Sequence, residues 1–255
     1  MNEQFYHDIN ALKQAGTVCL EEAPRDLDTW VCAQLATRTG ENILNIGCDS
    51  NEQILSLART IGQDGYVLAI DRSYRALNAL SQRSQASGLE QRIRFLYLNL
   101  DDLAGHLRPE DFHWAISGRA LSHIKQPQAV FQAIRQALKP GGIFFFYGLA
   151  RKDLLELRLF HAALRNETRE SRELLFIEQV GAPCTRNVFP RAEFIKFECP
   201  LRFTSPDALY AYWHESDLYE EALDKDFRRA AVQHFQAYAA FETAQRLIGV
   251  RAING

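Results

Sequence analysis

Short apolar runs alternate with amphipathic segments between residues 42 and 147, and this alternation constrains the fold more than any other feature of the chain. The runs are rich in β-branched and aromatic residues, so we predict strands at residues 42–46, 66–70, 93–98, 112–117 and 143–147. The intervening segments carry apolar residues at i, i+3, i+4 and i+7, as over residues 54–61, which is the spacing of an amphipathic helix. The last of these helices is predicted to end at Lys139-Pro140-Gly141-Gly142.

Strands that alternate with helices in this way pair in parallel through right-handed crossovers. We therefore predict an α/β fold, namely a Rossmann-like, doubly wound, mostly parallel seven-stranded sheet with a helical cap. Residues 194–199 and 246–253 are the two remaining candidate strands. The run IFFFY at residues 143–147 is bulky on both faces, as a strand covered by helices on both sides requires.

Composition places the chain among soluble globular proteins, since 47% of its residues are hydrophobic and 24% are charged. The net charge of −3 argues against a nucleic-acid partner. No apolar stretch approaches the roughly 18 residues of a membrane span, and the polar N-terminus is unlike a signal peptide, so we expect no membrane partner. The five scattered cysteines include no C-x-x-C pair, which favours a reducing cytoplasm over a disulfide framework or a metal site. No oligomeric state is indicated.

Ligands bind to sheets of this kind outside the carboxyl ends of the strands, where the strand order reverses. Four stretches of polar and small residues are then expected around one crevice: residues 47–51, Asp71, residues 99–102 and residues 117–123. Each of them directly follows one of the first four predicted strands, so the topology gathers them at one edge of the sheet.

Four segments at these strand ends carry a family pattern: ENILNIGCDSNEQILSLA, GYVLAIDRS, IRFLYLNLDDL and FHWAISGRALSHIKQPQAVFQAIRQALKPGG. Together they resemble the class I S-adenosylmethionine-dependent methyltransferases over roughly residues 40–148 and the closing strands. The fourth segment is the most specific, because a histidine after the strand, a helix and the Lys-Pro-Gly-Gly stop occur in order. The resemblance implies an enzyme that transfers a methyl group from S-adenosylmethionine to a small-molecule acceptor.

The resemblance also implies roles for individual residues. It places the cofactor against Asn45, Gly47, Cys48, Asp49, Asp71, Arg72, Asn99, Leu100 and Ser117. Asp71 is expected to accept hydrogen bonds from both ribose hydroxyls, and Asn99 with the Leu100 amide to bind the adenine edge. Residues 117–123 are expected to floor the methyl-transfer chamber, with His123 as the catalytic base. A packing role for His123 is the alternative.

The cofactor turn departs from the family pattern at several positions. Asn45 stands where an acid is usual, Asp49 and Asn51 replace the second and third glycines, and Asn99 replaces an aspartate. Asn and Asp tolerate a left-handed backbone better than other non-glycine residues, so the turn is expected to survive. Asp49 either binds the ammonium group of the cofactor or repels its carboxylate. A non-catalytic methyltransferase-like protein, acting as a partner subunit or binding a different ligand, is therefore the alternative function.

We predict a single methyltransferase-like domain over residues 1–255. Its parts are N-terminal helices (1–40), a cofactor-binding core (41–150), a cap insertion (151–191), and closing strands and helices (192–255). Within the cap insertion, residues 151–165 are predicted as a helix and residues 166–191 as irregular. After it, Ser205-Pro206 marks the start of a helix, and a last helix carries an apolar stripe from Phe227 to Tyr238.

Other candidate residues and functions are less favoured. His161 and His214 are alternative acceptor contacts, although a surface or packing role is favoured for each. Cys184 is disfavoured as a nucleophile because it lies in the predicted cap and not after the fourth strand. A nicotinamide dehydrogenase is excluded, since the turn lacks G-x-G-x-x-G and the chain has no Tyr-x-x-x-Lys pair. A nucleic-acid base methyltransferase is disfavoured, since no Asn-Pro-Pro-aromatic run follows the fourth strand.

Overall fold

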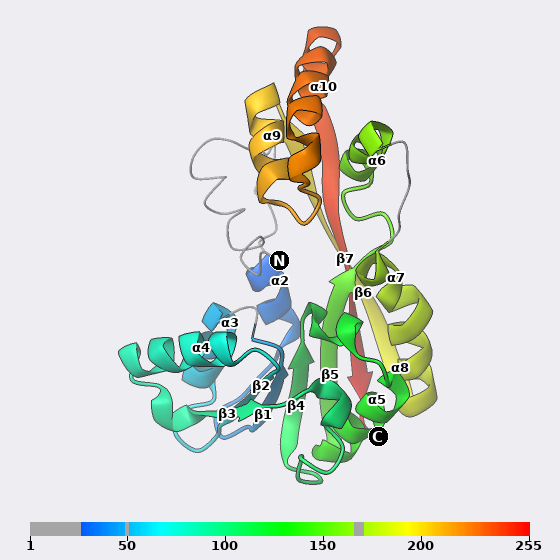
Figure 1. Cartoon of the computed structure of the whole chain (residues 1–255). Helices are drawn as coiled ribbons and strands as arrows, with labels where there is room; N and C mark the ends of the chain where they lie inside the picture. Colours follow the sequence, from blue (N-terminus) through cyan, green and yellow to red (C-terminus); the bar gives the residue numbers. More distant parts are fainter. Residues whose placement is uncertain (1–26, 49–50, 166–170) are drawn as a thin grey trace. The chain divides into compact units, whose positions relative to one another are not determined.

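The computed structural model describes residues 27–48, 51–165 and 171–255 (Figure 1). Contacts between residues divide the chain into two compact units. The larger unit takes Asp28–Arg151, Arg172–Lys196 and Leu247–Gly255, and the smaller unit takes Lys152–Ser171 and Phe197–Arg246. A single domain over the whole chain remains a prediction.

A seven-stranded sheet organises the fold, with the order β3-β2-β1-β4-β5-β7-β6. The strands are β1 (Ile43–Ile46), β2 (Val67–Asp71), β3 (Ile93–Tyr97), β4 (Phe112–Ser117), β5 (Leu138–Leu149), β6 (Arg191–Phe203) and β7 (Phe241–Ile253). Strands β3, β2, β1, β4 and β5 pair in parallel, and β7 pairs antiparallel to β5. This confirms the predicted mostly parallel, doubly wound sheet.

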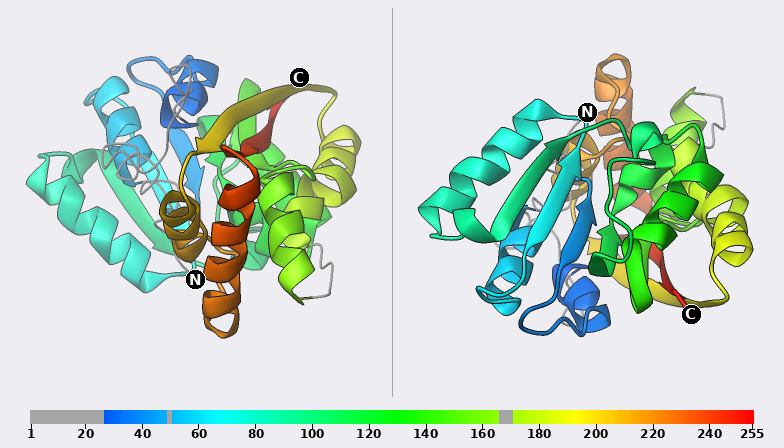
Figure 2. Two further views of the ribbon diagram at one scale, coloured as in Figure 1. Left: turned by 90° about the horizontal axis from the view of Figure 1, so that it is seen from above. Right: turned by 90° about the horizontal axis from the view of Figure 1, so that it is seen from below.

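Helices cover both faces of the sheet of the larger unit, which Figure 2 shows from two sides. These helices are α2 (Leu27–Gln34), α3 (Asn51–Thr60), α4 (Tyr74–Ala86), α5 (Pro127–Ala137), α7 (Arg172–Phe176) and α8 (Ala182–Val188). Successive phenylalanines of β5 contact opposite layers: the Phe144 ring lies 5.5 Å from Phe131 of α5, and the Phe145 ring lies 5.9 Å from Trp30 of α2. All three phenylalanines of the IFFFY run are fully buried, as the sequence predicted.

The strand order reverses at β1, which lies between β2 and β4. The last residue of β1, Ile46, is paired with Ile70 of β2 on one side and with Ser117 of β4 on the other. The loops that leave these strands therefore start side by side at the carboxyl edge of the sheet, where ligands of open α/β sheets bind.

The prediction of irregular structure for residues 166–191 is wrong for its described part, which is helical from Arg172 to Val188. α7 continues through a π-helical turn (Ile177–Gly181) into α8. Gly181 and Pro183 suggest a break in the sequence, yet both lie within this helical run, Gly181 at the end of the π-helical turn and Pro183 near the start of α8. A Cβ at Gly181 would lie 3.1 Å from the Phe146 ring, so this glycine permits close packing on β5.

The predicted cap segment, residues 151–191, is divided between the two units. α8 packs in the larger unit, where Phe189, which follows it, lies 5.9 Å from Phe144 of β5. The predicted helix at 151–165 is α6 (Leu155–Arg165) and belongs to the smaller unit. A cap function for the segment remains a prediction.

The smaller unit contains α6, α9 (Pro206–Glu215), a 3₁₀ turn at Glu221–Leu223, and α10 (Asp224–Ala237), together with parts of β6 and β7. The Ser205 hydroxyl accepts a hydrogen bond from the Ala208 amide at 3.2 Å, which confirms the predicted N-cap of α9. Trp213 of α9 and Phe227 of α10 stack with ring centroids 4.0 Å apart and form the centre of this unit. Tyr238 lies just past α10 and is 64% exposed, so it does not belong to the predicted apolar stripe.

The predicted N-terminal helix that begins near Phe5 lies outside the described residues. The second predicted N-terminal helix is α2, which buries Trp30 and Val31. Within the part of the chain that is described, none of the helices combines the length and the hydropathy needed to cross a membrane.

Candidate functional site

Gly47 forms the turn that leaves β1. Its φ of +88° is in the left-handed region that favours glycine. A Cβ at this position would lie 2.6 Å from the Cβ of Ala120, which belongs to the 3₁₀ turn η3 (Arg119–His123) after β4. Both the backbone conformation and the close approach of the two loops therefore require glycine here.

Asp71, the last residue of β2, faces the same turn. Its Oδ2 accepts a hydrogen bond from the Cys48 amide at 2.7 Å, and its Oδ1 accepts one from the Ser73 amide at 2.7 Å. An ionised carboxylate offers about four acceptor sites, so each oxygen keeps capacity for one more donor. The two backbone bonds hold the Asp71 carboxylate in one orientation beside the Gly47 turn.

Asn45 has a function inside the turn that the sequence comparison with the family did not indicate. Its side chain is buried, and its Nδ2 donates a hydrogen bond to the Gly47 carbonyl at 2.5 Å. An ionised acid at this position has no proton to donate and would face the carbonyl oxygen. The departure from the family pattern therefore stabilises the turn that this chain has.

The two replaced glycines of the pattern have different outcomes. Asp49 lies outside the described residues. Asn51 is the first residue of α3, so its backbone is helical, and the left-handed conformation considered for this position is wrong. Among the described residues of the turn, only Gly47 has a positive φ, because the chain enters α3 within four residues of it.

The loop after β3 contains Asn99, which is exposed, and Leu100, which is buried. The Asn99 Oδ1 accepts a hydrogen bond from the Asp101 amide at 3.2 Å and caps the short 3₁₀ turn η2 (Leu100–Asp102). The Asp101 Oδ1 in turn accepts the amides of Lys125 and Gln126 at 2.7 and 2.8 Å, just before α5. The sequence placed Asp101 among residues 99–102 at the crevice but did not indicate these two contacts, since the partners are 24 and 25 residues away.

Ser117 ends β4 and its hydroxyl donates to the Ile46 carbonyl at 3.0 Å. This buried bond ties the end of β4 to the end of β1, the strand from which the Gly47 turn leaves, so Ser117 has a structural role. The next residue, Gly118, lies against the phenol of Tyr147 from β5: a Cβ there would be 3.1 Å from the Tyr147 hydroxyl. Tyr147 is a second residue that the sequence reasoning missed.

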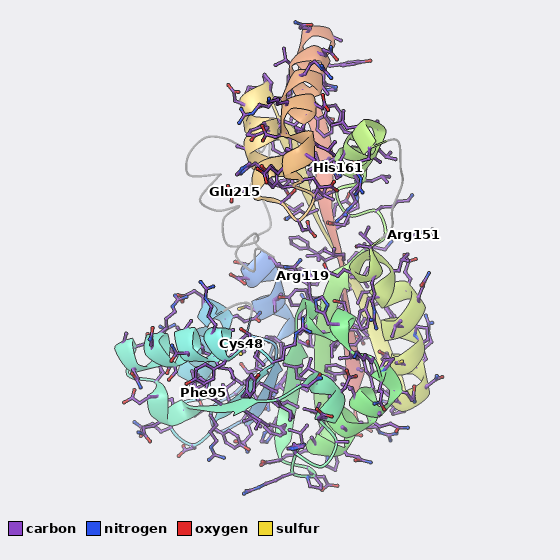
Figure 3. The ribbon with its side chains drawn as sticks, in the orientation of Figure 1. Cys48, Phe95, Arg119, Arg151, His161 and Glu215 are labelled. Carbon is purple, nitrogen blue, oxygen red and sulfur yellow. The ribbon has the colours of Figure 1, made fainter. Side chains whose placement is uncertain are left out.

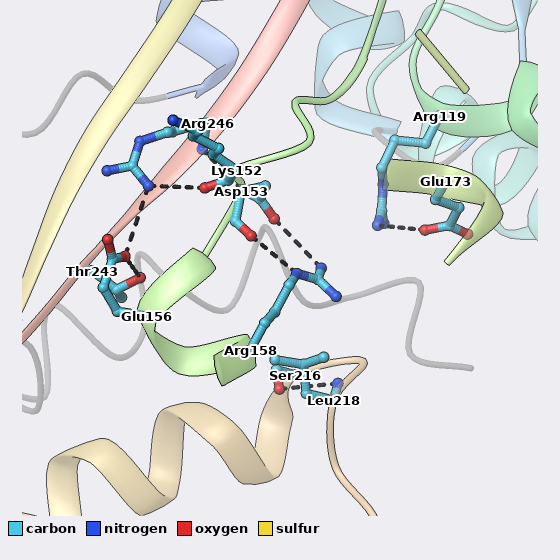
Figure 4. A network of polar contacts seen from close by, with 10 residues as sticks. All are labelled: Arg119, Lys152, Asp153, Glu156, Arg158, Glu173, Ser216, Leu218, Thr243 and Arg246. Carbon is cyan, nitrogen blue, oxygen red and sulfur yellow. Dashed lines mark hydrogen bonds and ion pairs between the residues drawn. The ribbon is translucent and has the colours of Figure 1, made fainter. Parts of the chain in front are cut away.

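His123 ends η3 and is 42% exposed. Its Nε2 lies 3.5 Å from Oε1 of Glu173 in α7. Nη1 of Arg119 lies 3.9 Å from Oε2 of the same carboxylate, a contact that Figure 4 shows. The guanidinium of Arg172 donates to the carbonyl of Ile124, directly after η3. Two consecutive α7 residues thus contact the loop that carries His123, and neither was singled out in the sequence.

The remaining candidates lie in other environments. Arg72 directly follows Asp71 and is exposed, and Cys48 is buried at the start of the turn (Figure 3). Burial raises the pKa of the Cys184 thiol, which disfavours a thiolate nucleophile in α8. His161 belongs to the smaller unit, where burial lowers its pKa although Glu220 lies 3.7 Å away.

His214 also belongs to the smaller unit and lies 3.2 Å from Glu215 on α9. Over the described residues, no group of three or more His, Cys, Asp or Glu side chains converges in a way that would hold a metal ion. The polar residues of the larger unit's strand ends therefore make up the candidate site.

Comparison with known proteins agrees with this arrangement. The family model described as a methyltransferase domain matches residues 37–190, so the chain belongs to the methyltransferase-domain family. The 2-phytyl-1,4-naphtoquinone methyltransferase of Nostoc punctiforme is 28% identical over 131 residues, which cover 51% of this chain and 56% of that protein. A ubiquinone biosynthesis O-methyltransferase of Paraburkholderia phymatum is 34% identical over 122 residues, covering 48% and 50%. The chain thus spans about half the length of these relatives.

Solved structures show the same fold at low sequence identity. A SAM-dependent methyltransferase from Aquifex aeolicus has a TM-score of 0.57 at 11% identity, with 100% of both chains covered. The [4+2]-cyclase SpnF has a TM-score of 0.56 at 16% identity, covering 98% of this chain and 94% of that one. The sheet is therefore that of the class I methyltransferase fold, a fold that also includes a protein described as a cyclase.

Proposed function

We propose that the protein is an enzyme that transfers a methyl group from S-adenosylmethionine to a small-molecule acceptor. The observation that carries the proposal is the Asp71 carboxylate, held by the Cys48 and Ser73 amides at the carboxyl edge of the sheet with acceptor capacity remaining. A vicinal diol such as a ribose supplies two hydroxyl donors for such a carboxylate. The match to a methyltransferase-domain family over residues 37–190 supports the same function.

The residues around Asp71 fit the nucleoside half of the cofactor. Asp71 would hold the ribose, and the loop of Asn99 and Leu100 would hold the adenine. Cys48, whose amide donates to the Asp71 carboxylate, and Arg72, the next residue after Asp71, would line the approach. When bound, S-adenosylmethionine supplies an electrophilic methyl group on a sulfonium. The residues of this chain would bind it, orient the acceptor and take up the acceptor's proton.

The acceptor in this proposal is a small molecule bound near η3. Proteins that are similar over about half of this chain include a 2-phytyl-1,4-naphtoquinone methyltransferase and a ubiquinone biosynthesis O-methyltransferase, and the second name supports a hydroxylated ring as the acceptor class. The phenol of Tyr147 and the imidazole of His123 offer polar contacts for such a ring. The net charge of −3 supports a small molecule over nucleic acid, and the scattered cysteines support a cytoplasmic location.

The second candidate function is a methyltransferase-like protein that transfers no methyl group. It is favoured by Asn45, whose amide is engaged with the Gly47 carbonyl and which lacks the negative charge usual at this position. A charge-assisted contact of this kind contributes about 1.5–3 kcal/mol to binding, so its loss weakens the grip on the cofactor's ammonium group.

A binding titration separates the two functions. We expect S-adenosylmethionine and S-adenosylhomocysteine to bind the wild-type protein in calorimetry, and Asp71→Ala to weaken both by at least about tenfold, since the charge-assisted bonds to the ribose are lost. Asp64→Ala, at an exposed aspartate before β2, is the matched control and should bind as the wild type does. Thermal melting checks that Asp71→Ala is folded. No binding to the wild type at millimolar ligand would favour the second function.

A further inference from the structure

Glu173 joins two side chains of the loop after β4, and no role has been assigned to it. One carboxylate oxygen lies 3.5 Å from His123 Nε2 and the other lies 3.9 Å from Arg119 Nη1. The Glu173 and Arg119 side chains are only 24% and 22% exposed, whereas His123 is 42% exposed. The carboxylate and the guanidinium are therefore the shielded members of the group, and the imidazole is the member most open to a ligand.

The backbone around Glu173 is held in place on both sides. Leu174 and Phe176 of α7 are buried, and the preceding residue, Arg172, donates to the Ile124 carbonyl at the end of η3. The Arg172 side chain thus contacts the backbone just after η3, and the Glu173 side chain contacts the His123 side chain within it. These two contacts set the position of Glu173 relative to His123. A carboxylate fixed in this way selects one tautomer and one ring orientation of a histidine partner.

We propose that Glu173 is a positioning residue for His123 in the methyl-transfer reaction. Its carboxylate receives the Nε2–H of His123 and leaves the lone pair on Nδ1. In the transfer, the bond from the methyl group to the acceptor oxygen would form as its bond to sulfur breaks, which leaves a neutral thioether. The acceptor's O–H bond would break and an N–H bond would form at Nδ1, so that the imidazole becomes an imidazolium. Glu173 stabilises this new positive charge, and water removes the proton afterwards. This inference rests on the proposed function.

The charges around His123 oppose one another. Glu173 of α7 favours the imidazolium, and so does Asp101 of the loop after β3, which accepts the Lys125 amide. Arg119 and Lys125 on the histidine's own segment and Arg172 on α7 disfavour it. Removing the Glu173 carboxylate therefore takes away a negative charge that lies 3.5 Å from the imidazole. The imidazole would then accept a proton less readily, so the acidic limb of a rate profile should move to lower pH while the maximal rate falls.

The first experiment needs no acceptor. Carbethoxylation of His123 by diethyl pyrocarbonate, which attacks the neutral imidazole, is followed by peptide mass spectrometry from pH 5 to 8 in the wild type, Glu173→Gln and Glu178→Gln. Glu178 is exposed in the adjoining π-helical turn and provides the matched control. We expect the modification profile of Glu173→Gln to shift to lower pH and that of Glu178→Gln to stay with the wild type. If the profile of Glu173→Gln coincides with that of the wild type, the proposed interaction between Glu173 and His123 is refuted.

The second experiment separates positioning from a structural role. With S-adenosylmethionine and catechol as the acceptor probe, Glu173→Gln should lower kcat by about tenfold or more, move the acidic limb to lower pH, and leave the KM for S-adenosylmethionine unchanged. Glu173→Asp should recover part of kcat. An unchanged kcat in Glu173→Gln would refute the positioning role. Failure of the wild type to bind S-adenosylmethionine would refute the proposed function instead, and the modification profiles would still report on the pair.

Discussion

At the scale of single residues, Asn45 explains how the chain departs from its family and still forms the turn after β1. Its amide donates to the Gly47 carbonyl inside a buried environment, where an unmet hydrogen-bonding group is costly. The family's usual acid at this position would be out of place in this turn. Asn45 is compatible with the proposed binding of a nucleoside at Asp71, because the Asn45 side chain contacts the Gly47 carbonyl and the Asp71 side chain has other partners.

Asn45→Asp should therefore destabilise the protein, although it restores the family's residue. At neutral pH the new carboxylate cannot donate and faces the Gly47 carbonyl, so we expect a loss of about 1–3 kcal/mol in the free energy of urea unfolding. The loss should shrink in acid, where the protonated side chain regains a donor. Asn78→Asp, at an exposed site of α4, adds the same charge as a control. Equal stability of both variants at pH 7 would contradict the role given to Asn45.

Asp153 in the smaller unit makes stability depend on pH. Burial raises its pKa from 3.8 to about 6, against the lowering effects of the Arg246 amide at 2.8 Å from Oδ1 and of Arg158 at 3.6 Å from Oδ2 (Figure 4). The nearby charge of Asp217 raises the pKa further. Because the pKa is higher in the folded chain than in the unfolded one, folding favours the protonated acid.

The sign of the effect follows from this difference. The Asp153 contribution to stability is fully present below pH 3.8 and is lost as the pH rises through about 6, by roughly 3 kcal/mol in total. Asp153→Asn should remove this part of the slope of unfolding free energy between pH 4 and 6, measured by urea unfolding at several pH values. A slope that is the same in wild type and variant would show that another group titrates in this range.

At the scale of elements, the candidate site lies where the turn after β1 approaches the turn after β4. The turn after β1 and the turn after β4 meet at Gly47 and Ala120, and the helices α3 and α5 follow these turns along the chain. α7 adds Arg172 and Glu173 to the same loop from a distant part of the sequence. The site is therefore built by three elements of the larger unit, each set in place by the packing of its own apolar residues.

Gly47→Ala should disrupt this close approach for two separable reasons. The new methyl group would meet the Ala120 side chain, and the positive φ would be strained, each by roughly 1–3 kcal/mol. Ala120→Gly in the same chain should relieve the first term only, so the double variant should regain part of the stability lost in urea unfolding. The single variant Ala120→Gly completes the cycle. A double variant no more stable than Gly47→Ala would show that contact with Ala120 has no part in the effect.

At the scale of the whole molecule, the described chain divides into a sheet-centred unit and a smaller unit rich in stacked aromatic side chains. The sequence predicted the first well, since period-2 and period-3.6 patterns are local signals. It also predicted that Gly47 forms the turn after β1 and that Asp71 ends β2, because a turn glycine and an acid that ends a strand are recognised from adjacent residues. It failed at residues 172–188, which were predicted as irregular and are helical. Gly181 and Pro183 are residues that usually interrupt a helix, but here Gly181 permits close packing on Phe146 and Pro183 lies near the start of α8.

The sequence by itself thus determined the element order, the parallel sheet and the family, because these depend on residue spacing along one stretch of chain. Only the tertiary structure decided which side chains meet: Glu173 with His123, Asp101 with the amides before α5, and Tyr147 with Gly118. Their partners are 24 or more residues apart, and no local pattern records a contact that distant packing creates. The Asn45 amide contacts a residue only two positions away, yet its use depends on burial, which the sequence does not display.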